Sequence, residues 1–224
     1  MKIGVLLPSR FSDSGDYLAD ARALDAAGVD SLWLPDDGFD PWLVLAGIAA
    51  VTGRARLMAP VSPRETGAPD ELSRRIATLD RLSRGRLVLT ATPPVDARAT
   101  QALISCARRA GQYPVLLPST GDGAGGTAAI QADGLIGAGD SPEQCRELFE
   151  EIARRREQDG LKPPFELWAR IGQPDGREDW RRLVAAGEAA GATGLLVASN
   201  PRLLDLLRNT DEEDDRSDLT LAQG

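Results

Sequence analysis

The sequence has 224 residues, 42% of them hydrophobic, which suits one large domain or two small ones with a sizeable core. The formal net charge is −8, but residues 211–218 alone contribute −5, so the rest of the chain is nearly neutral. No basic patch is present that could neutralise a phosphate backbone, which argues against nucleic-acid binding.

Cysteine usage and the start of the sequence indicate the compartment. Cys106 and Cys145 both fall in expected helices and are too few for a disulfide framework. Met1 and Lys2 lead directly into an apolar strand without a basic-then-apolar leader, and no apolar run has the length of a membrane span. We therefore expect a cytoplasmic protein that is neither exported nor inserted in a membrane.

The first half of the sequence alternates short apolar runs with helical patterns. Strands are expected at 3–7, 32–34, 56–59, where Pro60 ends the run, and 87–89. Helices are expected at 16–27 and 41–51, the second with Asp40 as its N-cap. A third helix precedes Gly85 and carries one apolar stripe, formed by Leu72, Ile76, Leu79 and Leu82.

The second half continues the alternation. Strands are expected at 114–117, 135–136, 165–171 and 194–198, and a glycine-rich loop at 121–126. Helices are expected at 96–110, around 127–131, from Ser141 as N-cap to about 158, at 178–190 and at 201–207.

Eight strand-helix units follow one another at intervals typical of βα repeats, which favours a compact (β/α)₈ TIM barrel over a doubly wound open sheet. The barrel domain spans residues 1–208. The acidic segment 209–224 is expected to be a solvated, disordered tail rather than a docking peptide.

Several motifs follow one another along the chain: GVLLP, LDAAGVDSLWLPD, DPWLVLAGIAAVTGRARLMAPV and RRIATLDRLSRGRLVLTAT, and then YPVLLPSTGDGAGG, AAIQADGLIGAGDSPEQC and GATGLLVASNP. Together they resemble the bacterial luciferase-like family of flavin- and deazaflavin-dependent monooxygenases and oxidoreductases. The resemblance covers about 200 residues in the family's order. It implies a TIM barrel that uses FMN or a deazaflavin.

Two departures from the family pattern bear on activity. Relatives carry a long insertion after the fourth strand that helps to build a substrate lid, whereas here Thr90 to Pro94 leads almost directly into the next helix. Many members place an Asp-His pair after the second strand, whereas this sequence has Asp36 and Asp37 there and contains no histidine. A mechanism that needs an imidazole is therefore excluded for this chain alone.

Sites of TIM barrels lie at the carboxyl ends of the strands, so the candidates are the residues that follow each strand. The candidate catalytic residues are Asp36 and Asp37, and no metal site is expected. The candidate cofactor-binding residues are Ser9, Pro60, Val61, Thr90, Thr92, Ser119, Thr120, Gly121, Arg170, Ser199 and Asn200.

Different chemistry is expected from different candidates. Ser119, Thr120 and the glycines after them suit a phosphate, because backbone N–H groups can approach it, although the segment could also be a plain loop. Arg170 could pair with the phosphate or form a structural salt bridge to a rim carboxylate. One carboxyl of the pair Asp36 and Asp37 could act as a general acid; the alternative is that one caps the next helix and the other faces water.

The resemblance implies an unusual cis peptide near Pro60 and Val61 that bulges toward the flavin ring, although trans is the default for an X-Pro bond. The four tryptophans are expected to pack in the core or between helices and barrel rather than to stack on a cofactor: Trp33, Trp42, Trp168 and Trp180.

Two functions remain open at this point. The first is an oxidoreductase or monooxygenase that acts on a small organic substrate, with FMN or a deazaflavin reduced by a nicotinamide or by a partner flavin reductase. The second is a shortened, non-catalytic relative that binds a flavin or nothing and acts as an accessory or interaction protein. Relatives often dimerise through barrel helices, so a homodimer is considered for either.

Overall fold

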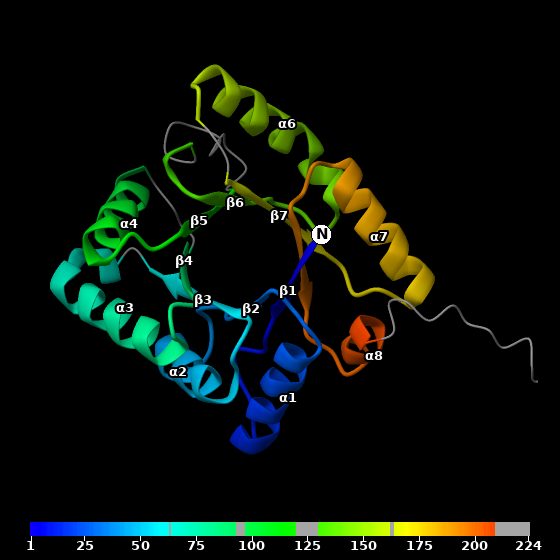
Figure 1. Ribbon diagram of the computed structural model, residues 1–224, viewed down its shortest axis with the longest axis horizontal. Coiled ribbons are helices and arrows are strands. Elements are labelled where there is room, and N and C mark those ends of the chain that lie inside the picture. The colour runs from blue at the N-terminus through cyan, green and yellow to red at the C-terminus, as the bar shows by residue number, and fades with distance from the viewer. Residues whose placement is uncertain (63, 93–96, 120–129, 162–163, 209–224) are drawn as a thin grey trace, which may run out of the picture.

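The computed structural model describes residues 1–62, 64–92, 97–119, 130–161 and 164–208, and these form a closed barrel of eight parallel strands surrounded by helices (Figure 1). The strands are β1 (Lys2–Leu6), β2 (Ser31–Trp33), β3 (Arg56–Val61), β4 (Leu87–Ala91), β5 (Val115–Pro118), β6 (Gly134–Ile136), β7 (Glu166–Ile171) and β8 (Gly194–Ala198). The helices are α1 (Ser14–Ala26), α2 (Pro41–Val51), α3 (Pro69–Ser83), α4 (Ala97–Ala110), α6 (Pro142–Gln158), α7 (Arg177–Ala189) and α8 (Leu203–Arg208), with a 3₁₀ turn, η1, at Glu65–Gly67.

Strand pairing closes the barrel in sequence order, because β1 pairs in parallel with both β2 and β8. The expected (β/α)₈ barrel is confirmed, and the open doubly wound sheet is excluded. The tail 209–224, the glycine-rich loop 121–126 and most of the short helix expected around 127–131 lie outside the described residues. Among the described residues, no helix is long and apolar enough to span a membrane.

The prediction that Pro60 ends the third strand is wrong. β3 continues through Pro60 to Val61, because it pairs with β4 up to Val61 but with β2 only up to Met58. Pro60 therefore has a neighbouring strand on one side alone, and its missing N–H is tolerated as on an edge strand.

Helix caps agree with the sequence in one case and differ in another. Asp40 Oδ1 accepts from the backbone N–H groups of Trp42 and Leu43 at 2.9 and 3.2 Å and so caps α2 as expected. Ser141 occupies the expected N-cap position of α6 with extended backbone, but its side chain makes no capping hydrogen bond.

The inner face of α3 differs from the expected stripe in one position. Leu72, Ile76 and Leu79 are buried, whereas Leu82 is 52% exposed and Ser83 is buried in its place. A helix returns to the same face after either three or four residues, and here the fourth residue after Leu79 is the one that faces the barrel. Leu79 and Leu82 each follow the preceding residue of the expected stripe by three positions, yet Leu79 faces the barrel and Leu82 faces solvent.

The amino-terminal end of the barrel is tied to the helices by Arg86. Its guanidinium donates to the carbonyl oxygens of Ala55 at 2.6 Å and Thr52 at 3.1 Å, and its Nε donates to that of Ser83 at 2.7 Å. Nearby, the carboxylate of Asp25 accepts from three successive backbone N–H groups, of residues 53, 54 and 55. The motifs that carry Asp25 and Arg86 in the sequence are therefore structural.

Two tryptophans fill the interior of the barrel. Trp33 of β2 and Trp168 of β7 meet edge to face, with ring centroids 5.3 Å apart and an angle of 67°. Glycines on β1 and β8 provide the room, because a Cβ at Gly4 would lie 2.5 Å from Trp33 Nε1 and one at Gly194 would lie 2.6 Å from the ring of Trp168. The interior is therefore a packed core, with its space at the carboxyl end.

Below the tryptophans, at the amino-terminal end, Glu166 forms a partly buried ion cluster. Its carboxylate accepts from Lys2 Nζ at 2.6 Å, from Arg56 Nη1 and Nη2 at 2.9 Å each and from Trp168 Nε1 at 2.9 Å. Burial alone would raise the pKa of Glu166, but the hydrogen bonds from Arg56, Lys2 and Trp168 outweigh it and lower the pKa to about 2.

The variant Glu166→Gln tests this cluster. Because the pKa in the folded state lies below the ordinary value of 4.5, the carboxylate stabilises the fold fully above pH 4.5 and loses that effect as the pH falls toward 2. We expect the variant to lower the free energy of unfolding by up to roughly 3 kcal/mol at pH 7, and the difference from the wild type to shrink below pH 4.5.

Denaturant titrations at several pH values measure this, with Glu147→Gln on the exposed face of α6 as the matched control. A loss of stability that is independent of pH would contradict the electrostatic explanation.

Candidate functional site

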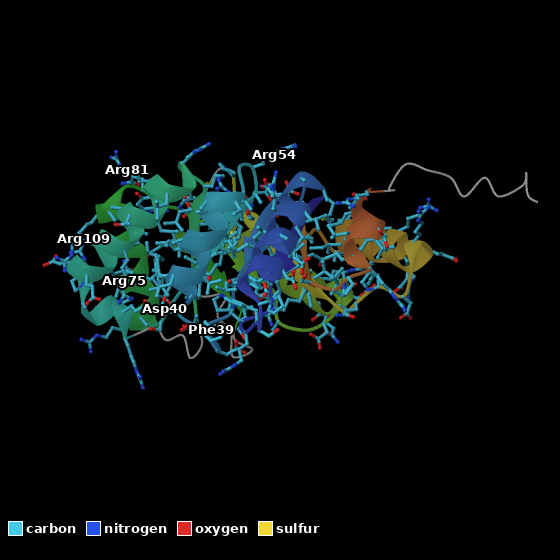
Figure 2. The ribbon with its side chains drawn as sticks, turned by 90° about the horizontal axis from the view of Figure 1, so that it is seen from below. Phe39, Asp40, Arg54, Arg75, Arg81 and Arg109 are labelled. Atoms are coloured by element: carbon cyan, nitrogen blue, oxygen red, sulfur yellow. The ribbon has the colours of Figure 1, made fainter. Side chains whose placement is uncertain are left out.

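A cavity of about 510 Å³ opens at the carboxyl ends of the strands. Figure 2 shows the barrel from the side, with Phe39 and Asp40 at this end and Arg54 and Arg81 toward the opposite end. Residues of seven strands or of the segments after them line the cavity, from Leu6 near the end of β1 to Arg170 on β7. The volume lies within the range of about 300–1,000 Å³ that is usual for small-molecule sites.

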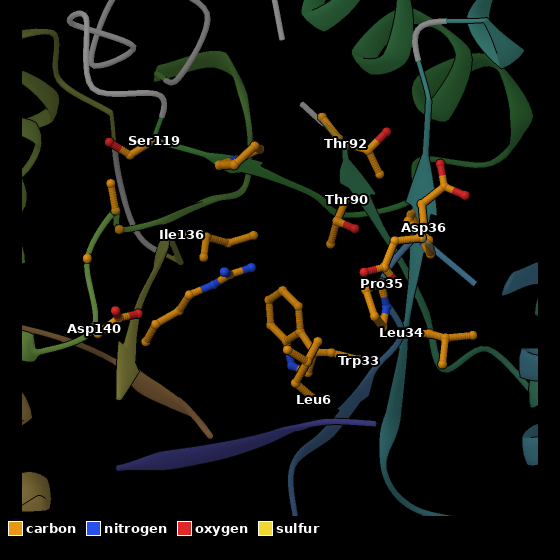
Figure 3. A pocket seen from close by; sticks show the side chains of 18 residues that line it. Leu6, Trp33, Leu34, Pro35, Asp36, Thr90, Thr92, Ser119, Ile136 and Asp140 are labelled. Carbon is orange, nitrogen blue, oxygen red and sulfur yellow. The ribbon is translucent and has the colours of Figure 1, made fainter. Parts of the chain in front are cut away.

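The floor of the cavity is apolar. Leu6, Trp33 and Ile136 line it and belong to the core inside the barrel (Figure 3). Trp33 is fixed by a hydrogen bond from its Nε1 to Ser31 Oγ at 2.8 Å, so its only polar group is satisfied below the cavity. The floor therefore offers an apolar surface, in which the indole of Trp33 presents no free N–H to the cavity.

Arg170 supplies positive charge at the wall. Residues 166, 168 and 170 alternate along β7, which places Arg170 on the inward side above Glu166 and Trp168. Its side chain lines the cavity and has no hydrogen bond or ion pair with any described residue. The expected alternative of a structural salt bridge is not found within the described part of the chain, so the guanidinium is available to a ligand.

Asp36 and Asp37 follow β2 and line the opposite wall. Burial, followed by the negative charges of Glu65, Asp40 and Asp37, raises the pKa of Asp36 above its ordinary value. Asp37 is exposed. The alternative that one of the pair caps the next helix is wrong, because Asp40 is the cap of α2.

Glu65, which contributes to this shift, is held in place by its neighbours. Its Oε2 accepts from the backbone N–H of Ser62 at 2.7 Å, and its Oε1 accepts from Trp42 Nε1 at 3.0 Å. Arg75 Nη1 also donates to Oε1, at 3.2 Å. The negative charge behind Asp36 is therefore fixed rather than mobile.

Hydroxyl groups line the wall next to Asp36. Thr90 and Thr92 donate weakly to the carbonyl oxygens of residues 59 and 61, both at 3.4 Å, and each keeps acceptor capacity toward the cavity. Ser119 and Pro60 also line it. Figure 3 shows Thr90, Thr92 and Asp36 on one side of the cavity and Ser119 and Asp140 on the other.

The remaining candidates are not among the residues that line the cavity. Val61 is 2% exposed and packs in the core between barrel and helices. Asn200 Oδ1 accepts from the N–H groups of residues 202 and 203 at the start of α8, and the backbone N–H of Ser199 donates to Leu6 O. The carbonyl oxygen of Ser9 contacts the loop after β2. Thr120 and Gly121 lie outside the described residues.

Sequence reasoning missed several lining residues. The alternation of inward positions along β1, β2 and β6 could have indicated Leu6, Trp33 and Ile136, but buried apolar residues were assigned to packing alone. Asp140 had no such signal, because it lies in the segment after β6, whose path does not follow from strand periodicity. Among the described residues, no group of three or more acids or cysteines is placed to hold a metal ion.

Comparisons with known proteins agree with this architecture. Residues 1–93 match the family model described as luciferase-like monooxygenase. A segment of 58 residues is 45% identical to the uncharacterized protein Rv0953c of Mycobacterium tuberculosis and, equally, to Mb0978c of Mycobacterium bovis. That segment is 24% of this chain and spans about a fifth, 21%, of each mycobacterial protein.

Solved structures extend the likeness of fold over the whole barrel. The coenzyme F420-dependent tetrahydromethanopterin reductase of Methanopyrus kandleri has a TM-score of 0.73 and 12% identity, with 92% of this chain and 96% of that one covered. The EDTA monooxygenase of Chelativorans sp. BNC1 has a TM-score of 0.64 and 15% identity, with coverage of 85% and 66%. The resemblance to the luciferase-like family is thus confirmed by sequence over residues 1–93, and the solved structures show a similar fold over the rest of the barrel.

Proposed function

We propose that the cavity at the carboxyl end binds FMN or a deazaflavin coenzyme and that the protein is an oxidoreductase or monooxygenase that acts on a small organic substrate. The observation that carries the proposal is Arg170, a guanidinium without a partner among the described residues, on the wall of a cavity with an apolar floor. Structures of similar fold support it, since they include F420-dependent enzymes, monooxygenases and a riboflavin lyase with modified FMN.

The residues present fit such a coenzyme. A flavin or deazaflavin combines a flat, largely apolar ring with a phosphate. The floor of Leu6, Trp33 and Ile136 offers apolar contact, and Arg170 offers charge-assisted hydrogen bonds of the kind that bind phosphates. The hydroxyl groups of Thr90 and Ser119 can form hydrogen bonds to the polar edge of the ring or to the phosphate.

When bound, the coenzyme supplies hydride transfer or, for a flavin, reaction with oxygen. The chain itself would bind the phosphate at Arg170, keep water from the floor and present the carboxyl of Asp36 as a group that could exchange a proton with the substrate. Burial and the nearby negative charges raise the pKa of Asp36 above its ordinary value, which is the direction that a general acid needs. The sequence contains no histidine that could exchange the proton instead.

A second candidate is a non-catalytic protein that binds the coenzyme or acts as an accessory to another protein. Two observations favour it. The sequence has no histidine, and only five residues, 92–96, separate β4 from α4, where relatives are expected to carry a lid. A non-catalytic protein that binds the coenzyme would use the same cavity and differ from the enzyme in turnover alone, whereas one that binds nothing would differ in binding as well.

Absorption spectroscopy separates the two candidates. We expect the purified protein to perturb the spectrum of added FMN or deazaflavin in a saturable way, and the bound coenzyme to bleach on addition of NAD(P)H alone or with a flavin reductase. Binding without bleaching under either condition would favour the accessory protein. No saturable change with either coenzyme would contradict the proposed site.

We also propose that the protein forms a homodimer through α2 and α3. The eleven residues of α2, PWLVLAGIAAV, include no charged or hydrogen-bonding side chain other than that of Trp42, although its Leu43 is 74% exposed beside the exposed Leu82 of α3. A helix that is apolar all round is normally buried. Glu71 and Arg74 border this face with opposite charges, so a second copy related by a twofold axis could pair with it.

Light scattering tests the dimer with the variant Leu43→Glu. We expect the wild type to have the mass of a dimer at micromolar concentration and the variant that of a monomer with an unchanged circular dichroism spectrum, because the buried charge opposes association. The control is Leu161→Glu, a leucine that is 40% exposed on another surface. A monomeric wild type, or a variant that stays dimeric, would refute the interface.

The cytoplasmic location expected from the sequence remains a prediction.

A further inference from the structure

We infer that Gly38 is a positioning residue, which fixes Asp36 and Asp37 at the wall of the cavity by allowing their loop to dock on the loop after β1. The inference rests on the proposed function in so far as the cavity is the ligand site. Residues 34–40, between β2 and α2, are called here the β2 loop, and residues 7–13, between β1 and α1, the β1 loop.

The first argument is the space at Gly38. A Cβ there would overlap the carbonyl oxygen of Ser9 and would lie 2.6 Å from the carbonyl carbon of the same residue. Both are backbone atoms of the β1 loop, so no side-chain rotation could relieve the overlap. The φ angle of Gly38 is not in the left-handed region, which means that glycine serves close approach here rather than an unusual conformation.

The second argument is that the two loops are joined at this same point. The backbone N–H of Phe39 donates to Ser9 O at 3.0 Å, and Arg10 Nη2 donates to Asp37 O at 3.4 Å. Aromatic rings cover the junction: Phe11 stacks on Tyr17 with centroids 4.3 Å apart and meets Phe39 edge to face at 5.0 Å. The β2 loop is therefore docked on a partner that α1 and β1 hold in place.

The third argument is that nothing else among the described residues fixes the two carboxylates. Neither side chain accepts a hydrogen bond or forms an ion pair with a described residue, although Asp36 faces the negative charges of Asp40 and Glu65 as well as that of Asp37. Repulsion from these charges favours outward movement of Asp36. The backbone of the β2 loop, and hence the contact at Gly38, must oppose it.

The experiment compares Gly38→Ala with Gly53→Ala. Gly53 is a matched control, because it lies in an exposed segment, has no positive φ and has nothing within 4 Å of an added Cβ. Titration of the Asp36 carboxyl is followed by NMR in the protein without coenzyme, and the dissociation constant for FMN is measured separately.

In Gly38→Ala the β2 loop should move outward, so we expect Asp36 to titrate closer to an ordinary aspartate because its burial decreases. We expect the dissociation constant for FMN to rise about tenfold, equal to ~1.4 kcal/mol, since one wall of the site moves. Gly53→Ala should change neither quantity. A merely structural role for Gly38 would lower the melting temperature and leave both quantities unchanged in the folded protein, and that result would overturn the inference.

If Gly38→Ala does not fold, Phe39→Ala replaces it, because Phe39 is 46% exposed and its removal loosens the same junction without a backbone clash. The pKa of Asp36 should then shift toward that of an ordinary aspartate, as in Gly38→Ala, and an unchanged titration would overturn the inference. The NMR measurement needs no coenzyme. A wild type that binds no FMN would therefore refute the proposed function, whereas the response of Asp36 would still decide the role of Gly38.

Discussion

The edge-to-face contact of Trp33 and Trp168 is the constraint on which the site depends. The two indoles occupy the middle of the barrel, and they fit there because Gly4 and Gly194 present no side chains to them. Their bulk closes the barrel toward its amino-terminal end and leaves the space at the carboxyl end, where Trp33 also forms part of the floor. The same packing that stabilises the fold therefore shapes the cavity.

The two ends of the barrel differ in whether their charged side chains are paired. At the amino-terminal end, Glu166 is matched by Arg56 and Lys2, and its low pKa reports a satisfied ion cluster. At the carboxyl end, Arg170 and Asp36 line one cavity without partners among the described residues, and the pKa of Asp36 is raised. Unmatched charges in a concave site are typical of ligand binding, whereas matched ones are typical of structural clusters.

Sequence reasoning reached the barrel because strand-helix units leave local signals. Apolar runs, Asp40 as a cap and the motif around Arg86 could each be interpreted without knowledge of the fold. Leu82 and Pro60 were misjudged because the exact face of a helix and the end of a strand depend on neighbours that local patterns do not specify. Candidates taken from strand ends included Asp36 and Arg170, but the contact between Gly38 and Ser9 joins two loops and leaves no local signal.

The central claim is that Arg170 gives the cavity its affinity for a phosphate-bearing coenzyme. The most direct measurement compares the affinities for FMN and riboflavin, which differ by the phosphate alone, in the wild type, in Arg170→Met and in the control Arg54→Met at the opposite end of the barrel. The wild type and the control should prefer FMN by about tenfold to a hundredfold, as expected for hydrogen bonds to a charged group. Arg170→Met should lose this preference and keep its affinity for riboflavin. Equal binding of FMN and riboflavin by the wild type, or an unchanged preference in Arg170→Met, would contradict the claim.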